Sequence, residues 1–297
     1  MVPVRMHGIN GLMTLLNTVN NTTKFDSLIL CEGIIFKKQK KIMSKHIFVL
    51  YLLMCCASSL SAQSTHVIEL AIIEVRYNVV HGTDKDQYAY RCGRNVSQYF
   101  SVNNLRDDSL RASPDPAISS IVLDEMLAEA LNRNDPSKRR PTSPGRGDYM
   151  YWNMPEGKIS VYTSVMGSKY VAEEDIPSME WEINEDSVMT VMDYECYMAK
   201  TRFRGREWTV WYTDAIPVSH GPWKFNGLPG MVLYAKCDGY ITISACAIST
   251  ANISPVKFYN FSDYKYEHIE RKKLLEMRSN PRLYPAKTRM TPRMELE

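Results

Sequence analysis

Three short turn sequences, each lying between two strand-like runs, limit the possible folds of this chain more than any other feature. The runs are rich in β-branched and aromatic residues, and the turns are Gly167-Ser168, Arg204-Gly205-Arg206 and Asp238-Gly239. Turns this short join antiparallel neighbours, whereas parallel strands need a crossover of a dozen or more residues. The pattern predicts an antiparallel sheet of hairpins, in the mainly β or α+β class. The strand-like runs cover residues 67–77, 87–92, 158–166, 169–173, 188–203, 207–213, 231–236 and 240–248.

One or two helices are expected to pack on this sheet. Asp115 can cap a helix and is followed by a proline that fits a first turn, so a helix is predicted from there to Asn134. A second helix is predicted over residues 263–278, with Asn280-Pro281 as its stop. The tail after Arg282 is polar and broken by prolines, so we expect it to be loosely ordered.

Residues 43–62 have the pattern of a secretory signal peptide, with Lys45 near the start, an uncharged apolar run, and small residues up to Ala62. Cleavage after Ala62 would leave an exported chain that begins at Gln63 and is periplasmic or secreted. A buried helix and a lipoprotein anchor are the alternatives. Residues 1–42 are predicted to be a non-native upstream extension, with a long basic N-region as the alternative.

Length and charge exclude two classes of partner. No other run approaches the ~20 apolar residues that cross a bilayer, so no membrane span is predicted in the mature chain. Residues 1–62 carry seven of the 36 basic and two of the 33 acidic side chains, which leaves residues 63–297 with a net charge of −2. Nucleic-acid-binding domains usually carry a basic excess, so no nucleic acid partner is predicted.

Without a repeat or a linker, residues 63–297 are predicted to form a single domain.

The most unusual stretch is the loop 215–230, which holds three glycines and three prolines among aromatic residues. Proline fixes φ and glycine permits positive φ, so this composition favours one defined backbone path. An ordered loop of this kind is a reasonable place for a binding site. The alternative is a structural plug that closes one end of the sheet. The candidate binding residues are His220, Trp223, Lys224, Phe225, Gly227, Leu228, Pro229 and Gly230.

Several motifs follow one another closely between Trp181 and Ile248. They are Asp193–Ala199, Phe203–Arg206, Trp211–Thr213 with Ile216-Pro217, and Gly221–Val232. This series resembles the GLPGLI family of exported bacterial proteins, whose name-giving hexapeptide stands here as Gly227-Leu228-Pro229-Gly230-Met231-Val232. The resemblance implies an exported, β-rich protein and names no activity and no catalytic residue.

Four cysteines follow the predicted cleavage point, namely Cys92, Cys196, Cys237 and Cys246. An even number in an exported chain predicts at least one disulfide. Cys237 and Cys246 lie at unequal distances from the Asp238-Gly239 turn, which argues against that pair. Cys196 paired with Cys92 or with Cys246 is as good an expectation, and buried free thiols are the alternative.

No motif predicts a cofactor or a bound metal. The closely spaced Cys and His ligands of a zinc site are missing, and the methionines at 189 and 192 fit a strand core better than a copper site. The adhesion tripeptide Arg146-Gly147-Asp148 is short enough to arise by chance. No nucleophile elbow or His-Glu-x-x-His helix occurs. The weaker catalytic candidates are Cys196 with His220, and the carboxylates Asp193, Glu195 and Asp214.

These observations favour a non-catalytic binding module of the cell envelope, with a protein, a peptide or an apolar molecule as its ligand. A carrier would have a curved sheet with an apolar concave face, and a partner-binding protein would have a flat apolar patch. The alternative is an envelope hydrolase with an unrecognised active site, for which we expect a deep polar pocket with a histidine or carboxylates of shifted pKa.

Overall fold

The computed structural model describes residues 65–132, 135, 144–284, 290 and 293–297. All of them lie in one compact unit, Gln63–Glu297. The predicted signal peptide at 43–62 and the predicted upstream extension 1–42 lie outside the described residues. Among the residues described, no helix is long and apolar enough to cross a membrane.

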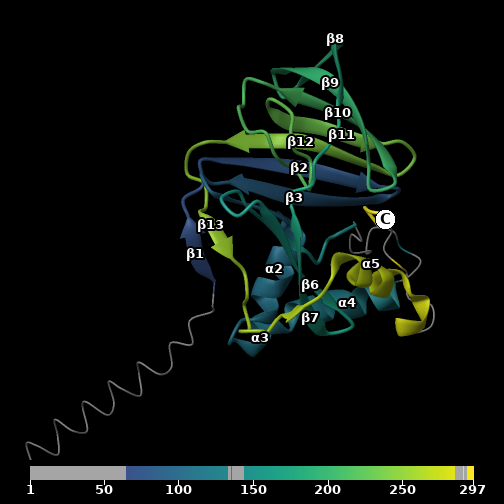
Figure 1. Cartoon of the computed structure of the whole chain (residues 1–297). Helices are drawn as coiled ribbons and strands as arrows, with labels where there is room; N and C mark the ends of the chain where they lie inside the picture. The colour runs from purple at the N-terminus through teal and green to yellow at the C-terminus, as the bar shows by residue number, and fades with distance from the viewer. Residues whose placement is uncertain (1–64, 133–134, 136–143, 285–289, 291–292) are drawn as a thin grey trace, which may run out of the picture. The chain divides into compact units, whose positions relative to one another are not determined.

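Twelve strands form one large sheet, in the order β14-β7-β6-β5-β4-β3-β2-β12-β11-β10-β9-β8 (Figure 1). Every neighbouring pair is antiparallel except β14 and β7, so the predicted class of antiparallel hairpins is confirmed. A separate pair joins β1 to β13. The strands are β1 (His66–Glu69), β2 (Ile73–His81), β3 (Asp84–Cys92), β4 (Val96–Ser101), β5 (Tyr149–Asn153), β6 (Lys158–Val165), β7 (Ser168–Asp175), β8 (Glu182–Val191), β9 (Tyr194–Phe203), β10 (Arg206–Thr213), β11 (Met231–Cys237), β12 (Ile241–Ser249), β13 (Val256–Phe258) and β14 (Glu267–His268).

Two runs that the sequence presented as single strands are divided. The run 188–203 contains a hairpin, because Met192 and Asp193 have φ angles of 50° and 65° and turn the chain between β8 and β9. Positive φ at both central residues is the geometry of the tightest hairpin turn, and it is uncommon for methionine. The run 67–77 is also divided, since β1 pairs with β13 and β2 pairs with β12 and β3.

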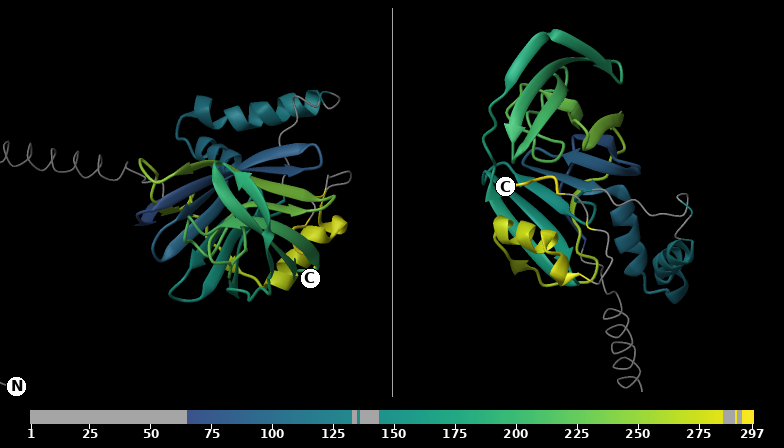
Figure 2. Two further views of the ribbon diagram at one scale, coloured as in Figure 1. Left: turned by 90° about the horizontal axis from the view of Figure 1, so that it is seen from above. Right: turned by 90° about the vertical axis from the view of Figure 1, so that its right-hand side faces the viewer.

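The large sheet is strongly curved. Val161 on β6 and Ile243 on β12 line the same cavity, although five strand steps separate them in the sheet. In a flat sheet those steps would span roughly 24 Å. Figure 2 shows the two halves of the sheet turned toward each other. One hydrophobic core lies on the concave face and takes residues from both halves.

The helices are α2 (Val102–Arg111), α3 (Pro116–Ser119), α4 (Ile121–Leu131) and α5 (Arg271–Ser279), with the short 3-10 turn η2 (Pro281–Leu283) after α5. Asp115 caps α3 as predicted, since its carboxylate accepts a hydrogen bond of 2.9 Å from the Ala117 amide. The sequence prediction missed α2. It also began the last helix too early, because Glu267 and His268 pair with β7 before α5 starts.

Two further expectations differ from the structure. All four cysteines after the predicted cleavage point are free thiols, so the predicted disulfide is wrong. Cys92 and Cys196 lie on β3 and β9, which are five steps apart in the sheet, and Cys246 lies in a bulge opposite β2. The tail returns to the fold at residues 293–297, where Glu295 is only 6% exposed.

Candidate functional site

The loop between β10 and β11 fills the concave interior of the sheet. The side chains of Trp223, Phe225 and Leu228 are buried, with exposed fractions of 4%, 0% and 2%. The Trp223 ring packs against Trp208 of β10, with ring centroids 5.3 Å apart. On the opposite half of the sheet, Trp152 Nε1 of β5 donates a hydrogen bond to the carbonyl oxygen of Trp223. The loop therefore connects the two halves of the curved sheet.

Two glycines allow the loop to approach its neighbours closely. A Cβ atom at Gly221 would lie 2.4 Å from the ring of Tyr90, and one at Gly230 would lie 1.9 Å from the main-chain oxygen of Thr213. Gly221 also has a φ of 81°, which disfavours any side chain. These contacts explain why the loop needs glycine at both positions.

His220 lies at the edge of the loop and is half-buried. Its Nδ1 shares a short hydrogen bond with the hydroxyl of Tyr90, and its ring stacks on Trp152 with centroids 5.4 Å apart. Burial lowers the pKa of His220 from 6.5 to about 4. The imidazole is therefore neutral at neutral pH and acts as a packed, hydrogen-bonded ring.

The other predicted binding residues are mostly enclosed. The side chain of Lys224 is 3% exposed, and Gly230 is buried beside Thr213. Gly227 and Pro229 are the exposed members of the predicted set. This burial favours the structural reading of the loop, while direct contact between the loop and a partner stays a prediction.

A cavity of about 500 Å³ lies on the concave face of the sheet. Of the predicted loop residues, Trp223 and Lys224 line it. Its volume falls in the range of small-molecule sites, and it combines an apolar wall with a few charged groups, as such sites do. The apolar wall includes Val79, Tyr99, Met150, Val161, Ile241 and Ile243.

One charged cluster on the cavity wall surrounds Lys224. Its ammonium forms short ion pairs with Glu174 of β7 and with Glu295 of the tail. Arg271 of α5 contacts the second oxygen of Glu295 at 2.6 Å. Burial alone would raise the pKa of Glu295, but the charge and hydrogen bond of Lys224, with the charges of Arg271 and Arg204, lower it. The carboxylate of Glu295 is therefore held ionised.

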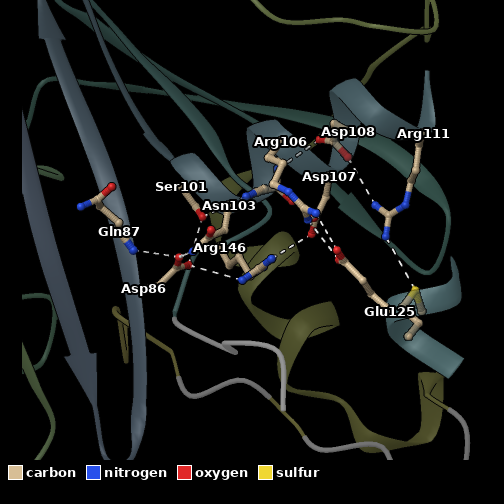
Figure 3. A network of polar contacts seen from close by, with 12 residues as sticks. Asp86, Gln87, Ser101, Asn103, Arg106, Asp107, Asp108, Arg111, Glu125 and Arg146 are labelled. Carbon is tan, nitrogen blue, oxygen red and sulfur yellow. Dashed lines mark hydrogen bonds and ion pairs between the residues drawn. The ribbon is translucent and has the colours of Figure 1, made fainter. Parts of the chain in front are cut away.

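A second group of charges ties the loop before β5 to the rest of the fold. Arg146 Nη2 lies 2.9 Å from Asp107 Oδ2 of α2, and Arg146 Nη1 lies 3.8 Å from Asp86 Oδ2. Figure 3 shows Arg146 pointing toward both carboxylates. Asp148 is paired with Arg278 of α5. Both charged side chains of the Arg146-Gly147-Asp148 tripeptide are thus engaged inside the protein.

The described hydrogen bonds of Cys196 and His220 go to other partners: His220 bonds Tyr90, and Cys196 Sγ donates to the Tyr194 oxygen. Burial raises the pKa of the Cys196 thiol to about 11, which opposes a thiolate nucleophile. Asp193, Glu195 and Asp214 are exposed at strand ends. Within the described part of the chain, no group of three or more His, Cys, Asp or Glu side chains is arranged to hold a metal ion.

The sequence analysis missed most of the charged residues on the cavity wall. They come from β7, the loop before β5, α5 and the tail, so no single motif contains them all, although Arg146 and Asp148 belong to the tripeptide noted in the sequence. One feature of the sequence could have indicated a charged wall, namely the many basic residues of the last helix, which include Arg271 and Arg278. The charged lining residues that it did not name are Glu173, Glu174, Arg271, Arg278, Arg293 and Glu295.

Residues 158–234 match the model of one family. It is described as "Protein of unknown function (Porph_ging)". The match runs from β6 into β11 and includes the loop 215–230. A likeness at family level is thereby shown for this part of the chain, and the GLPGLI name is not confirmed by it.

Two solved structures are weakly similar to this chain. They are structures of PNGF-II in the C2 and P21 space groups, each with a TM-score of 0.44 and 12% sequence identity. Each match covers 69% of this chain and 32% of the PNGF-II chain, so this chain corresponds to about a third of that protein. No curated protein matches the chain.

Proposed function

We propose that this chain is an exported, non-catalytic envelope protein that binds an apolar molecule in the cavity on its concave face. The observation that carries the proposal is the cavity itself, which has a volume of about 500 Å³ and an apolar wall. The wall comes from a continuous hydrogen-bonded sheet, so a ligand would meet a preformed surface. Preformed apolar cavities are typical of small-molecule binding sites.

The charged groups on the wall support binding over catalysis. Glu174 and Glu295 are paired with Lys224, and Asp148 is paired with Arg278. General acid–base catalysis needs a group that exchanges a proton near the working pH. Glu295, whose pKa is lowered by Lys224 and its neighbouring arginines, is a poor candidate for that role. His220, the histidine with a shifted pKa, is not among the described residues that line the cavity.

The proposal is tested with Nile red, a neutral dye that fluoresces in apolar surroundings. We expect saturable binding of one dye molecule to the protein. Ala172→Phe should abolish this binding, because Ala172 is 4% exposed and lines the cavity. A phenyl ring there would occupy the space that the dye needs.

Ala128→Phe is the matched control, because Ala128 is exposed on α4 and is not a lining residue. It should bind Nile red as the unsubstituted protein does. Circular dichroism and thermal unfolding would establish that both variants are folded. Equal dye binding by a folded Ala172→Phe variant, or no saturable binding by the unsubstituted protein, would refute the proposal.

A further inference from the structure

The cluster around Lys224 joins three cations to two side-chain carboxylates. Lys224, Arg204 and Arg271 contact Glu174 and Glu295. Arg271 Nη1 also donates to the oxygen of Glu297 at 2.7 Å. The side chain of Lys224 is 3% exposed and that of Arg271 is 14% exposed. Lysine is almost never buried without a partner, so the two carboxylates are needed to keep these cations inside the protein.

The two carboxylates are held in different ways. Glu174 is part of β7 and is fixed by the ladder with β6. Glu295 belongs to the tail, which is hydrogen-bonded to the Arg204–Arg206 turn. The amide of Leu296 donates to the oxygen of Arg204 at 3.0 Å, and Arg206 Nε donates to the oxygen of Met294 at 3.1 Å. Glu295 thus reaches the cations from the tail segment 293–297 and not from a strand of the sheet.

One donor in the cluster is left without a partner. Arg204 Nε is buried and has no hydrogen-bond acceptor among the described residues. The nearest oxygen of Glu295 is 3.9 Å away from it. A carboxylate that moved slightly closer could accept this hydrogen bond as well as those of Lys224 and Arg271. The arginine fork is well matched to a carboxylate.

We propose that Lys224 and Arg271, which line the cavity, form an anion subsite with Arg204, which contacts the same two carboxylates, and that Glu295 and the carboxylate of a long-chain fatty acid compete for it. The hydrocarbon chain of the ligand lies against the apolar wall. In this arrangement the head group of the ligand binds beside the cavity-lining tail residues Met294 and Glu295. This inference rests on the proposed function, since it names the ligand class for the same cavity.

Displacement of Nile red by dodecanoate and by dodecanol tests the inference, below the concentrations at which either molecule aggregates. The two probes share a chain and differ in the charge of the head group. The measured quantity is the dissociation constant for dodecanol divided by that for dodecanoate. Glu295→Gln should raise this ratio at least tenfold, because it removes the competing charge and keeps the shape of the side chain.

Glu173→Gln is the matched control, since Glu173 lines the cavity and has no ion pair with Lys224, Arg204 or Arg271 among the described contacts. It should leave the ratio within twofold of the unsubstituted value. Arg271→Gln should lower the ratio at least fivefold, and it decides the question if Glu295→Gln does not fold. Dodecanol binding with a ratio unaffected by either substitution would overturn the inference and leave the proposed function standing. If neither molecule displaced the bound dye, this inference would fail, while the proposed function would still be decided by Nile red binding to the unsubstituted protein and to Ala172→Phe.

Discussion

Trp152 on β5 donates its indole hydrogen to the carbonyl oxygen of Trp223, 3.1 Å away, and so joins one half of the sheet to the loop that packs against the other half. Both residues are buried, with exposed fractions of 0% and 4%. A hydrogen bond in such surroundings also satisfies a carbonyl group that water cannot reach.

Trp152→Phe is expected to destabilise the protein more than Trp208→Phe. Both substitutions replace a fully buried indole ring with a smaller phenyl ring that has no N–H group. Only Trp152 loses a hydrogen bond, because Trp208 Nε1 has no hydrogen-bond partner among the described residues. The difference in the free energy of unfolding should therefore report the lost hydrogen bond and amount to about 1–2 kcal/mol. Urea unfolding at neutral pH gives both values. Equal losses would mean that the bond contributes nothing to the connection.

Gly230→Ala should cost about 3 kcal/mol of stability, because the added methyl group would lie within 1.9 Å of the Thr213 oxygen. Backbone atoms cannot move aside as a flexible side chain can. Gly147→Ala is the control, since no atom lies within 4 Å of the added carbon. It should change the stability by no more than about 0.5 kcal/mol. A similar, small effect of both substitutions, measured by thermal unfolding, would contradict the close packing of the loop.

His220 should make the protein less stable in mild acid. Its pKa is about 4 in the folded protein and 6.5 when unperturbed, so the unfolded chain binds a proton over this interval that the folded chain does not. The contribution of His220 to the free energy of unfolding is fully present above pH 6.5. It declines as the pH falls toward 4, by roughly 3 kcal/mol at most. His220→Asn should flatten the curve of unfolding free energy against pH between these values.

His268→Asn is the control for that experiment, because the side chain of His268 is 77% exposed. For this variant, the free energy of unfolding should change with pH as steeply as it does for the unsubstituted protein. If the His220 and His268 variants gave the same slope, the neutral state of the buried imidazole would not be a source of stability.

The four cysteines should all react with a thiol reagent after unfolding without reductant, since none is linked in the structure. In the folded protein, Cys246 is half-buried and the other three are buried. We therefore expect the reaction of the folded protein with the thiol reagent to have a fast phase of one thiol, and Cys246→Ser should remove this fast phase. Two thiols or fewer after unfolding would restore the disulfide that the sequence predicted.

The leader makes a prediction that concerns processing. N-terminal sequencing of the exported protein should begin at Gln63, because the small residues that end at Ala62 fit a signal-peptide cleavage site. A mature chain that kept residues before Met43 would rule out this reading of the leader.

The hairpins were predictable because their turns are local. Arg204-Gly205 and Asp238-Gly239 contain the residues that accept positive φ, and strands follow on both sides. The turn at Met192-Asp193 was missed because it lacks glycine, and its positive φ angles are imposed by the pairing of β8 with β9. The last helix was extended too far because the pairing of β14 with β7 is a long-range contact.

The loop was recognisable from its glycines and prolines, and two of its residues, Trp223 and Lys224, do line the cavity. The cavity itself was beyond sequence reasoning. Its charged wall joins Glu174, Arg271 and Glu295, which are far apart along the chain. They meet because α5 contacts β7 and the tail is hydrogen-bonded to the Arg204–Arg206 turn. The even number of cysteines was misleading because Cys92 and Cys196 lie five strands apart in the sheet. Cys237 and Cys246 lie on neighbouring strands, but Cys237 is paired with Ile241 and not with Cys246.

The loop 215–230 also works as a spacer. Its buried rings stand between β5 and β10, and closely packed side chains resist compression, so their thickness sets how far apart the two arms of the sheet are held. A relative with smaller rings at positions 223 and 225 would have a narrower cleft, and one with bulkier rings a wider one. Ligand size could then change among relatives through substitutions in this loop, without any change in the residues that contact the ligand.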